Sequence, residues 1–391
     1  MLNLKGAGLP DVIKLSNYLR NDYEAVRLSD LRADQTLEMD VSLDGKHQHP
    51  DLPIVAEWIG AEGREGVHTA LLSIRNSPGF TLNFTNKSEV KNSRGRGLAI
   101  SKSDGFTIND PYVRSARTAG IALEDCKGFT FNRGITLGTG NYQDKKGEGP
   151  NWPGSIKMQR CSGYTMNDCY SILHVGNGMT PTGCDGGTWN NPTCIDIDGA
   201  SIYLNAASGH IVNGGLCFGN AKAQPPAYVL NSEKEVEGVS EGARLEDCSC
   251  FDADVGFGIW GNQGKEGLVL EHVAVLNSLM IANEGWKVHE NATVQQLDQT
   301  GTLYLDPKAL PAGVLTELRT LGTALADVVR RHEAWPIIAG RRAALVAAIA
   351  KLRKPAPVPV DVPALRAWLS EAADLPAQIE AWLARGRALV G

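Results

Sequence analysis

The stretch LAISKSDGFTIN (Leu98–Asn109) is followed by IALEDCKGFTFN (Ile121–Asn132), and the two share one pattern. Apolar residues alternate, and then come a glycine, an aromatic residue, a threonine, an apolar residue and an asparagine. Further copies read LSIRNSPGFTLN (Leu72–Asn83), IKMQRCSGYTMN (Ile156–Asn167) and, more weakly, IYLNAASGHIVN (Ile202–Asn213). Because alternation is typical of strands and glycine permits a sharp bend, each copy predicts two short strands joined by a turn.

The copies recur at spacings that fit the coils of a solenoid. Their glycines are Gly79, Gly105, Gly128, Gly163 and Gly209, so consecutive copies are 26, 23, 35 and 46 residues apart. Such repeats bury their apolar faces only when they are stacked on one another. Stacking predicts an aromatic ladder of Phe80, Phe106, Phe129 and Tyr164 beside a corner of Asn83, Asn109, Asn132, Asn167 and Asn213.

This coil pattern resembles the right-handed parallel β-helix superfamily, the architecture of pectate lyases, polygalacturonases and phage tailspikes. The resemblance covers residues 67–305 and implies an all-β right-handed parallel β-helix there, while the composition after Pro307 predicts a C-terminal α-helical region. It rests on the coils and on no catalytic motif of a family. The resemblance therefore implies a fold and leaves the reaction open.

Three parts are predicted along the chain. Residues 1–66 form an N-terminal cap with a short helix at Pro10–Asn21, since the open end of a solenoid needs a cover. Residues 67–307 form the β-helix. Residues 308–391 are rich in Ala, Leu and Arg, and their apolar spacing predicts helices. This region is either a small bundle packed on the end of the β-helix or a module for oligomerisation or attachment.

Three insertions are predicted to leave one edge of the β-helix, at residues 138–153, 176–192 and 219–242. Loops on a rigid scaffold commonly carry function. Exposed aromatic rings beside polar groups suit sugar rings, so the candidate glycan-binding residues come from the first two insertions. They are Tyr142, Glu148, Trp152, Asp185 and Trp189. The alternative is that the tryptophans anchor the insertions to the body, because Trp is rarely left wholly exposed.

The candidate catalytic pair is Asp196 and Asp198, in the stretch CIDIDG. If Ile195 and Ile197 point inward, both carboxylates face outward about 7 Å apart. Two carboxyls at such a separation can serve as acid and base on a glycosidic bond. The stretch resembles an Asp-rich motif of polygalacturonases, although that family's second Asp-Asp, Gly-His-Gly and Arg-x-Lys motifs are missing. The alternative is a pair of solvated aspartates.

The outward positions of the first strand in each copy are polar and mixed in charge. They are Ser73 and Arg75, Ala99 and Ser101, Ala122 and Glu124, Lys157 and Gln159, Tyr203 and Asn205, and Arg244 and Glu246. Pectate lyases bind Ca²⁺ through carboxylates on such a face, but the sequence has no column of aspartates there. No metal and no other cofactor is therefore predicted.

The cysteines do not form a zinc motif, because Cys248–Cys250 is too closely spaced and has no second pair. Several others fall at repeat positions, which indicates small buried thiols, while Cys184 and Cys194 are candidates to pair in an oxidising compartment. Two lone histidines remain as candidate site residues, His174 and His210.

Charge and composition exclude some partners. The 391-residue chain carries a net charge of −6, with 12 Lys+Arg against 7 Asp+Glu from Lys308 onward, so the remainder carries −11. An acidic body with a basic tail argues against nucleic acid as the main ligand. No apolar stretch has the length of a membrane span, and no signal peptide is expected at the start.

Two functions from different classes remain, and whether the protein is an enzyme stays open. In the first, it is a structural virion protein of a bacteriophage, made in the bacterial cytoplasm, that binds a host-surface glycan. Resemblance to tailspikes then implies a homo-oligomer, a trimer in particular, and contacts to other virion proteins through the helical tail. In the second, it is a polysaccharide hydrolase or lyase with a loop-lined groove, exported by a non-classical route.

Overall fold

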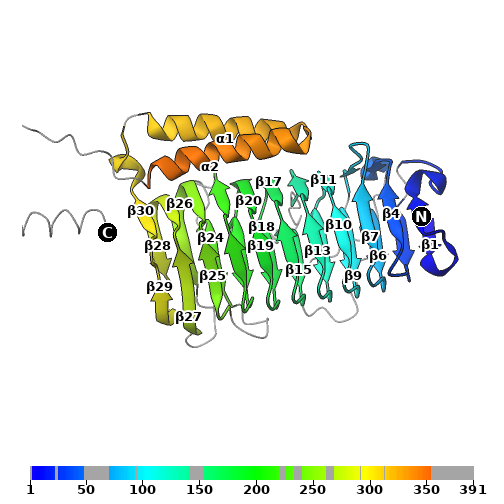
Figure 1. Ribbon diagram of the computed structural model, residues 1–391, viewed down its shortest axis with the longest axis horizontal. Helices are drawn as coiled ribbons and strands as arrows, with labels where there is room; N and C mark the ends of the chain where they lie inside the picture. The colour runs from blue at the N-terminus through cyan, green and yellow to red at the C-terminus, as the bar shows by residue number, and fades with distance from the viewer. Residues whose placement is uncertain are drawn as a thin grey trace, which may run out of the picture.

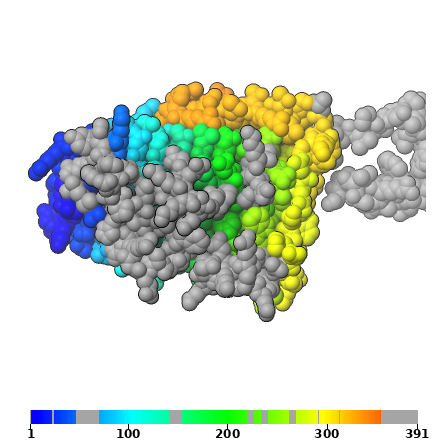
Figure 2. Space-filling view, turned by 180° about the vertical axis from the view of Figure 1, so that it is seen from behind, coloured from blue at the N-terminus to red at the C-terminus, as the bar shows by residue number. Residues whose placement is uncertain are grey.

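A computed structural model of the protein describes residues 2–22, 25–47, 70–93, 95–140, 154–219, 226–232, 240–260, 268–290, 292–311 and 313–353. The chain winds into a parallel β-solenoid, and two helices lie along one side of it (Figures 1 and 2). Strands of successive coils pair in parallel register, as Thr107–Asn109 do with Thr130–Asn132. The predicted parallel β-helix is confirmed.

Each coil contributes strands to up to three faces, which we number in chain order. Face 1 holds β1 (Leu2–Lys5), β3 (Val26–Ser29), β6 (Leu72–Arg75), β9 (Leu98–Ser101), β12 (Ile121–Glu124), β15 (Gly154–Gln159), β18 (Asn177–Thr182), β21 (Ile202–Asn205) and β24 (Tyr228–Asn231). Face 2 holds β2 (Val12–Lys14), β4 (Thr36–Met39), β7 (Thr81–Phe84), β10 (Thr107–Asn109), β13 (Thr130–Asn132), β16 (Thr165–Asn167), β19 (Thr188–Asn190), β22 (Ile211–Asn213), β25 (Ala243–Glu246), β27 (Leu268–Leu276) and β29 (Ala292–Asp298). Face 3 holds β5 (Leu43–Asp44), β8 (Val90–Lys91), β11 (Tyr112–Arg114), β14 (Ile135–Leu137), β17 (Tyr170–His174), β20 (Thr193–Ile197), β23 (Leu216–Phe218) and β30 (Leu303–Leu305). Two long strands, β26 (Ser249–Trp260) and β28 (Leu279–Val288), continue from face 3 onto face 1.

The predicted internal ladders are present. Phe106 stacks on Phe80 with ring centroids 5.3 Å apart and on Phe129 at 4.9 Å, and Phe129 stacks on Tyr164 at 4.8 Å. At the corner between faces 2 and 3, each asparagine amide donates to the asparagine of the preceding coil, as Asn132 does to Asn109 at 2.8 Å. These ladders hold neighbouring coils in one register.

The insertion predicted at residues 176–192 is wrong, because this segment is a complete coil. It contains β18 and β19, β20 follows directly from Thr193, and Asn190 joins the asparagine ladder. Gly187 stands where the other copies carry their aromatic residue, and this removes the signature by which the copies are recognised. The copies that begin at Ile156 and Ile202 are therefore separated by one further coil.

The expected N-terminal boundary is also wrong. Strands β1, β3 and β4 pair in register with later coils, so the solenoid begins at Leu2. The helix expected at Pro10–Asn21 is instead strand β2 followed by a single 3-10 turn, η2 (Leu15–Asn17). Further 3-10 turns are η1 (Gly6–Gly8) and η3 (Gly45–His47). Residues 48–66 of the predicted cap lie outside the described residues.

Towards the C-terminal end, the register differs from the one that the repeat suggests. The stretch ARLED resembles the first strand of a copy, but β25 pairs with β22 on face 2, with Leu245 opposite Val212. Arg244 and Glu246 therefore do not belong to the outward positions of face 1.

Helices α1 (Val314–Arg330) and α2 (Trp335–Lys351) follow the turn η5 (Pro307–Ala309) and run along face 3, as Figure 1 shows. Their buried residues pack on outward residues of that face. The helices contribute Leu318, Leu325, Val329, Ile338, Leu345 and Ile349, and the strands contribute Tyr112, Tyr170, Phe218 and Phe251. Described helices thus cover the side of the solenoid, whereas the predicted bundle would cover its end. Neither is long and apolar enough to cross a membrane. The helices expected beyond residue 353 lie outside the described part of the chain.

Candidate functional site

Face 1 carries a row of outward-facing polar side chains, one from each coil, which we call the polar row. Along each strand, the residues that alternate with the outward ones point into the core, as Ile121 and Leu123 do on β12. Strand register places the row on one line across the sheet. The polar row consists of Arg75, Ser101, Glu124, Gln159, Thr182, Asn205 and Asn231.

Most of the polar row is buried. Ser101, Gln159, Thr182, Asn205 and Asn231 are between 2% and 6% exposed. Burying a polar group without a hydrogen bond costs about 1–3 kcal/mol, and apolar residues would fill such positions more favourably. The retained polarity therefore indicates contacts that apolar side chains could not make.

Two hydroxyl groups on this face make no hydrogen bond within the described structure. They belong to Ser101, in the polar row, and to Thr180, two residues before Thr182 on β18. Both side chains are more than nine-tenths buried and lie at outward positions. Each can donate and accept a hydrogen bond, which is the capacity that a polyhydroxylated ligand requires.

The charges in the middle of face 1 are paired closely. Arg96 Nη2 lies 2.8 Å from Glu124 Oε1, and the Arg96 side chain is almost fully buried. Lys157 lies one coil further on, where its backbone pairs with that of Ala122, and it too is buried. Glu124 is the one carboxylate side chain in the nine described strands β1 to β24 of this face.

A pocket of about 300 Å³ lies at the N-terminal end of the same face. We call it the basic pocket. Its polar lining comes from Asn3, Lys5, Arg27, Ser29, Ser73 and Arg75. Among the described residues, the lining thus contains three cations and no carboxylate, and Arg27 and Arg75 also make contacts within the protein. A concave site lined by one sign of charge concentrates ligands of the opposite sign.

The predicted catalytic pair lies elsewhere, where strand β20 leaves face 3. Ile195 packs against the helices while Ile197 enters the solenoid core, so the expected common inward orientation is wrong. Asp196 has a φ of 53°, which breaks the alternation, and its Oδ2 lies 3.3 Å from Arg330 Nη2 of α1. Asp198 follows in an exposed bend.

Partial burial raises the pKa of Asp196 above its usual value, and the Arg330 guanidinium acts in the opposite direction. A carboxyl group with a raised pKa can serve as a general acid, but Asp196 already has a structural partner in α1. The catalytic role of the two aspartates stays a prediction.

Of the predicted glycan-binding residues, only Asp185 and Trp189 lie within the described chain; Tyr142, Glu148 and Trp152 fall outside it. Trp189 is fully buried in the core of the solenoid, between Met166 and Val212 in register, so its expected exposure is wrong. Asp185 is exposed at the glycine turn and accepts a hydrogen bond from Ser208 at 2.9 Å. The structure does not bring these two side chains to a common surface.

The two candidate histidines are core residues. His210 lies in the aromatic column, where its Nε2 is 2.8 Å from the Tyr164 hydroxyl. His174 is buried with its Nδ1 2.8 Å from Thr139 Oγ1. Burial lowers the pKa of His210 to about 4, so this imidazole is neutral at pH 7.

The cysteines within the described residues are all free and buried, so Cys184 and Cys194 are not paired with each other. Among the described residues, no three of the His, Cys, Asp and Glu side chains lie together in a way that could hold a metal ion.

Sequence reasoning identified the outward polarity of face 1 but missed both its burial and the basic pocket. The polar pairs are visible in the repeat, as in Ser73 with Arg75. The pocket was missed because Lys5 and Arg27 belong to coils that lack the Gly-aromatic signature. A cation repeated at the end of the motifs LNLK and LSIR was the available signal.

No family model matches the sequence, and no curated protein matches it. Solved structures similar in fold include an alginate lyase from Paenibacillus sp. str. FPU-7, with 10% identity over 78% of this chain and 98% of the other and a TM-score of 0.42. A polygalacturonase from Erwinia carotovora ssp. carotovora has 10% identity over 78% and 89%, with a TM-score of 0.40. PfbA, a surface adhesin of Streptococcus pneumoniae, has 10% identity over 76% and 81%, with a TM-score of 0.36.

These likenesses concern the fold. The chain's own strands, joined coil by coil in parallel register on three faces, make it a parallel β-helix.

Proposed function

We propose that the protein binds an acidic polysaccharide along face 1. The observation that carries the proposal is the basic pocket, whose three cations stand at one end of the polar row. Ser73 and Arg75 line the pocket, and Arg75 also begins the polar row, so the two features are continuous.

The basic pocket has a defined task in this proposal. Lys5, Arg27 and Arg75 bind the carboxylates of the glycan, since charge-assisted hydrogen bonds are the stronger ones. Lys5, Ser29 and Arg75 stand in register on successive coils, about 4.8 Å apart along the solenoid axis. An extended polymer suits this arrangement better than a compact ligand does.

Binding is favoured over hydrolysis at this face. Glycosidases use two carboxyl groups that flank the scissile bond. Within the described strands β1 to β24 of face 1, Glu124 is the one carboxylate, and it is held in an ion pair with Arg96. The degradative alternative therefore depends on residues away from this row, such as Asp196 and Asp198.

Bacteriophage origin, trimeric assembly, location in a virion and attachment through residues 308–391 remain predictions from the sequence. The contacts of face 1 indicate the kind of ligand. They are compatible both with a virion protein and with a polysaccharide-degrading enzyme.

A binding panel tests the proposal. The wild-type protein is titrated with polygalacturonate, alginate and two neutral polymers, and the products are examined for new reducing ends and for unsaturated sugars. We expect affinity for the acidic polymers and none for the neutral ones. Equal affinity for the neutral polymers would contradict the role of the three cations, and turnover would identify the protein as an enzyme.

The matched variants are Arg27→Gln with Arg75→Gln on face 1, and Lys102→Gln with Lys127→Gln at exposed turns elsewhere. Each double variant removes two positive charges. Loss of affinity in the first alone assigns binding to face 1, whereas equal losses in both would indicate a response to net charge.

A further inference from the structure

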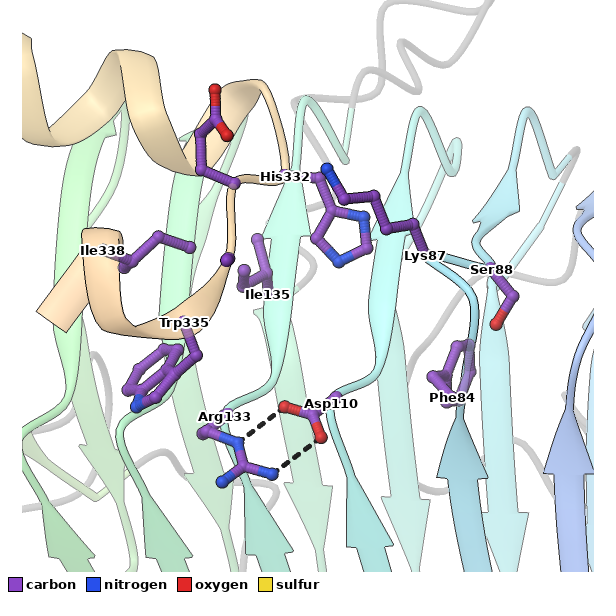
Figure 3. Close-up of a pocket in the computed structure, with 11 residues that line it drawn as sticks. Phe84, Lys87, Ser88, Asp110, Arg133, Ile135, His332, Trp335 and Ile338 are labelled. Carbon is purple, nitrogen blue, oxygen red and sulfur yellow. Dashed lines mark hydrogen bonds and ion pairs between the residues drawn. The ribbon is translucent and has the colours of Figure 1, made fainter.

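A second pocket, of about 170 Å³, lies where the turn between α1 and α2 meets the corner between faces 2 and 3 (Figure 3). We call it the hairpin pocket. Its lining includes Phe84, Lys87, Asp110 and Arg133 of the solenoid and His332 and Trp335 of the helix hairpin. A water molecule occupies about 30 Å³ in the liquid, so the volume suits one small molecule.

The helix hairpin holds its side of the pocket in a fixed position. The Tyr112 ring stacks on His332, with centroids 4.1 Å apart, and its hydroxyl donates to the Arg330 carbonyl at 3.1 Å. Trp335 packs edge-on against Tyr170, with centroids 5.9 Å apart. A wall held in this way loses little freedom when a ligand binds.

Lys87 reaches the pocket on an extended corner. Seven positions separate Asn83 from Val90, whereas four separate their register partners Asn109 and Val113. Lys87 also has a φ of 55°, in the left-handed region that disfavours lysine. Strain of this kind is frequently kept where a side chain has a task. The corner places the ammonium group of Lys87 beside the pocket, although Lys87 must adopt an unfavourable backbone conformation to reach it.

The other charges at the pocket are already paired. Arg133 donates to both carboxylate oxygens of Asp110, at 2.6 and 2.7 Å, as the dashed lines in Figure 3 mark. Glu333 lies 3.2 Å from Arg331. Lys87 has no ion-pair partner within the described residues, so it is the uncompensated charge of the pocket.

One further feature favours an anion. The 17-residue helix α2 begins at Trp335, so the positive end of its dipole lies at the pocket.

We propose that the hairpin pocket binds a small carboxylate that carries a ring, of the size of a single sugar acid. Its carboxylate contacts Lys87, and the apolar side of its ring packs on Trp335, while the Arg133–Asp110 pair offers donors and acceptors to hydroxyl groups. This site lies on a different part of the solenoid from face 1 and does not depend on the function proposed for that face.

Calorimetric titration of the full chain tests the proposal, with galacturonate as the probe, galactose as its neutral counterpart and acetate as a carboxylate without a ring. Galacturonate should bind, and Lys87→Met should weaken it at least tenfold, because one charge-assisted hydrogen bond is lost. Lys87→Arg should retain most of the affinity. Lys102→Met is the matched control, since Lys102 is also exposed and has a φ of 49°.

Several outcomes would overturn this assignment. They are the absence of galacturonate binding, equal binding of galactose or acetate, and an affinity that Lys87→Met leaves unchanged. Binding of polymeric glycans by face 1 should be the same in Lys87→Met as in the wild type, so failure of either proposal is distinguishable from failure of the other.

Discussion

His210 should make the stability of the solenoid fall in mild acid. The side chain is fully buried in the aromatic column, and Gly187 leaves the space that it fills. A Cβ at position 187 would lie 2.5 Å from His210 Nε2. Nδ1 lies 3.0 Å from the Ser208 carbonyl, which can only accept, so Nδ1 carries the proton and Nε2 accepts from Tyr164. The folded protein therefore holds a neutral imidazole.

The magnitude follows from the displaced pKa. Burial lowers the pKa of His210 from 6.5 to about 4, so between these values the unfolded chain binds a proton that the folded chain does not. The contribution of His210 to stability is complete above pH 6.5 and is lost as the pH falls towards 4. Each pKa unit is worth about 1.4 kcal/mol, so the full loss is about 3 kcal/mol.

Urea unfolding of the wild type and of the double variant His210→Phe with Tyr164→Phe, across this pH range, measures the effect. The variant keeps the aromatic column and removes both the titrating group and the hydroxyl that faces it. Carboxylates titrate in both proteins, so their effect cancels in the difference. The wild type should lose about 3 kcal/mol relative to the variant on acidification. A difference that stays constant with pH would refute the assignment of a neutral, buried His210.

Three further predictions follow from the described contacts. Trp189→Ala should lower the free energy of unfolding by about 3–5 kcal/mol because a buried aromatic side chain is lost; Trp286→Ala, at a residue 43% exposed, should change it by less than about 1 kcal/mol. Similar urea midpoints for both would contradict the core position of Trp189. Asp196→Asn with Asp198→Asn should leave glycan binding at face 1 unchanged, and an assay that finds turnover abolished would instead establish them as catalytic. Leu325→Ala should destabilise the protein by about 2–5 kcal/mol and loosen α1 from face 3; hydrogen exchange in α1 at the wild-type rate would speak against this packing.

The fold was predictable where the repeat was strong. Phe80, Phe106 and Phe129 recur beside a glycine, and a column of like residues can stack only if the coils are in register. The coil that contains Gly187 was not recognised because a glycine stands at its aromatic position. His210 from the next coil fills the space that the missing side chain leaves. A sequence pattern records which side chain is present at a position, whereas packing can fill that position from a neighbouring coil.

The placement of α1 and α2 could not be read from their own pattern. Their apolar stripe shows that they cover something, and the covered surface is the outward side of face 3, with Tyr112, Tyr170 and Phe251. Those residues follow the asparagine corner, outside the repeated phrase from which the coils were recognised.

The candidate site was predictable only in part. Ser101 and Gln159 are polar at outward positions in the sequence, but their burial is a property of the folded chain. The basic pocket joins β1, β3 and β6, whose residues are up to 72 positions apart (Asn3 to Arg75). A local sequence pattern predicts neither the burial of these side chains nor the contact between distant coils.

The most direct test of the central claim is the dissociation constant of polygalacturonate, measured at increasing salt for the wild type and for Arg27→Gln with Arg75→Gln. Two charge-assisted contacts at about 1.5–3 kcal/mol each predict that the variant binds at least a hundredfold more weakly at low salt. Its affinity should also fall less steeply as salt is added, because fewer ionic contacts remain to be screened. Equal dissociation constants and equal salt dependence would contradict the claim that face 1 binds an acidic polysaccharide.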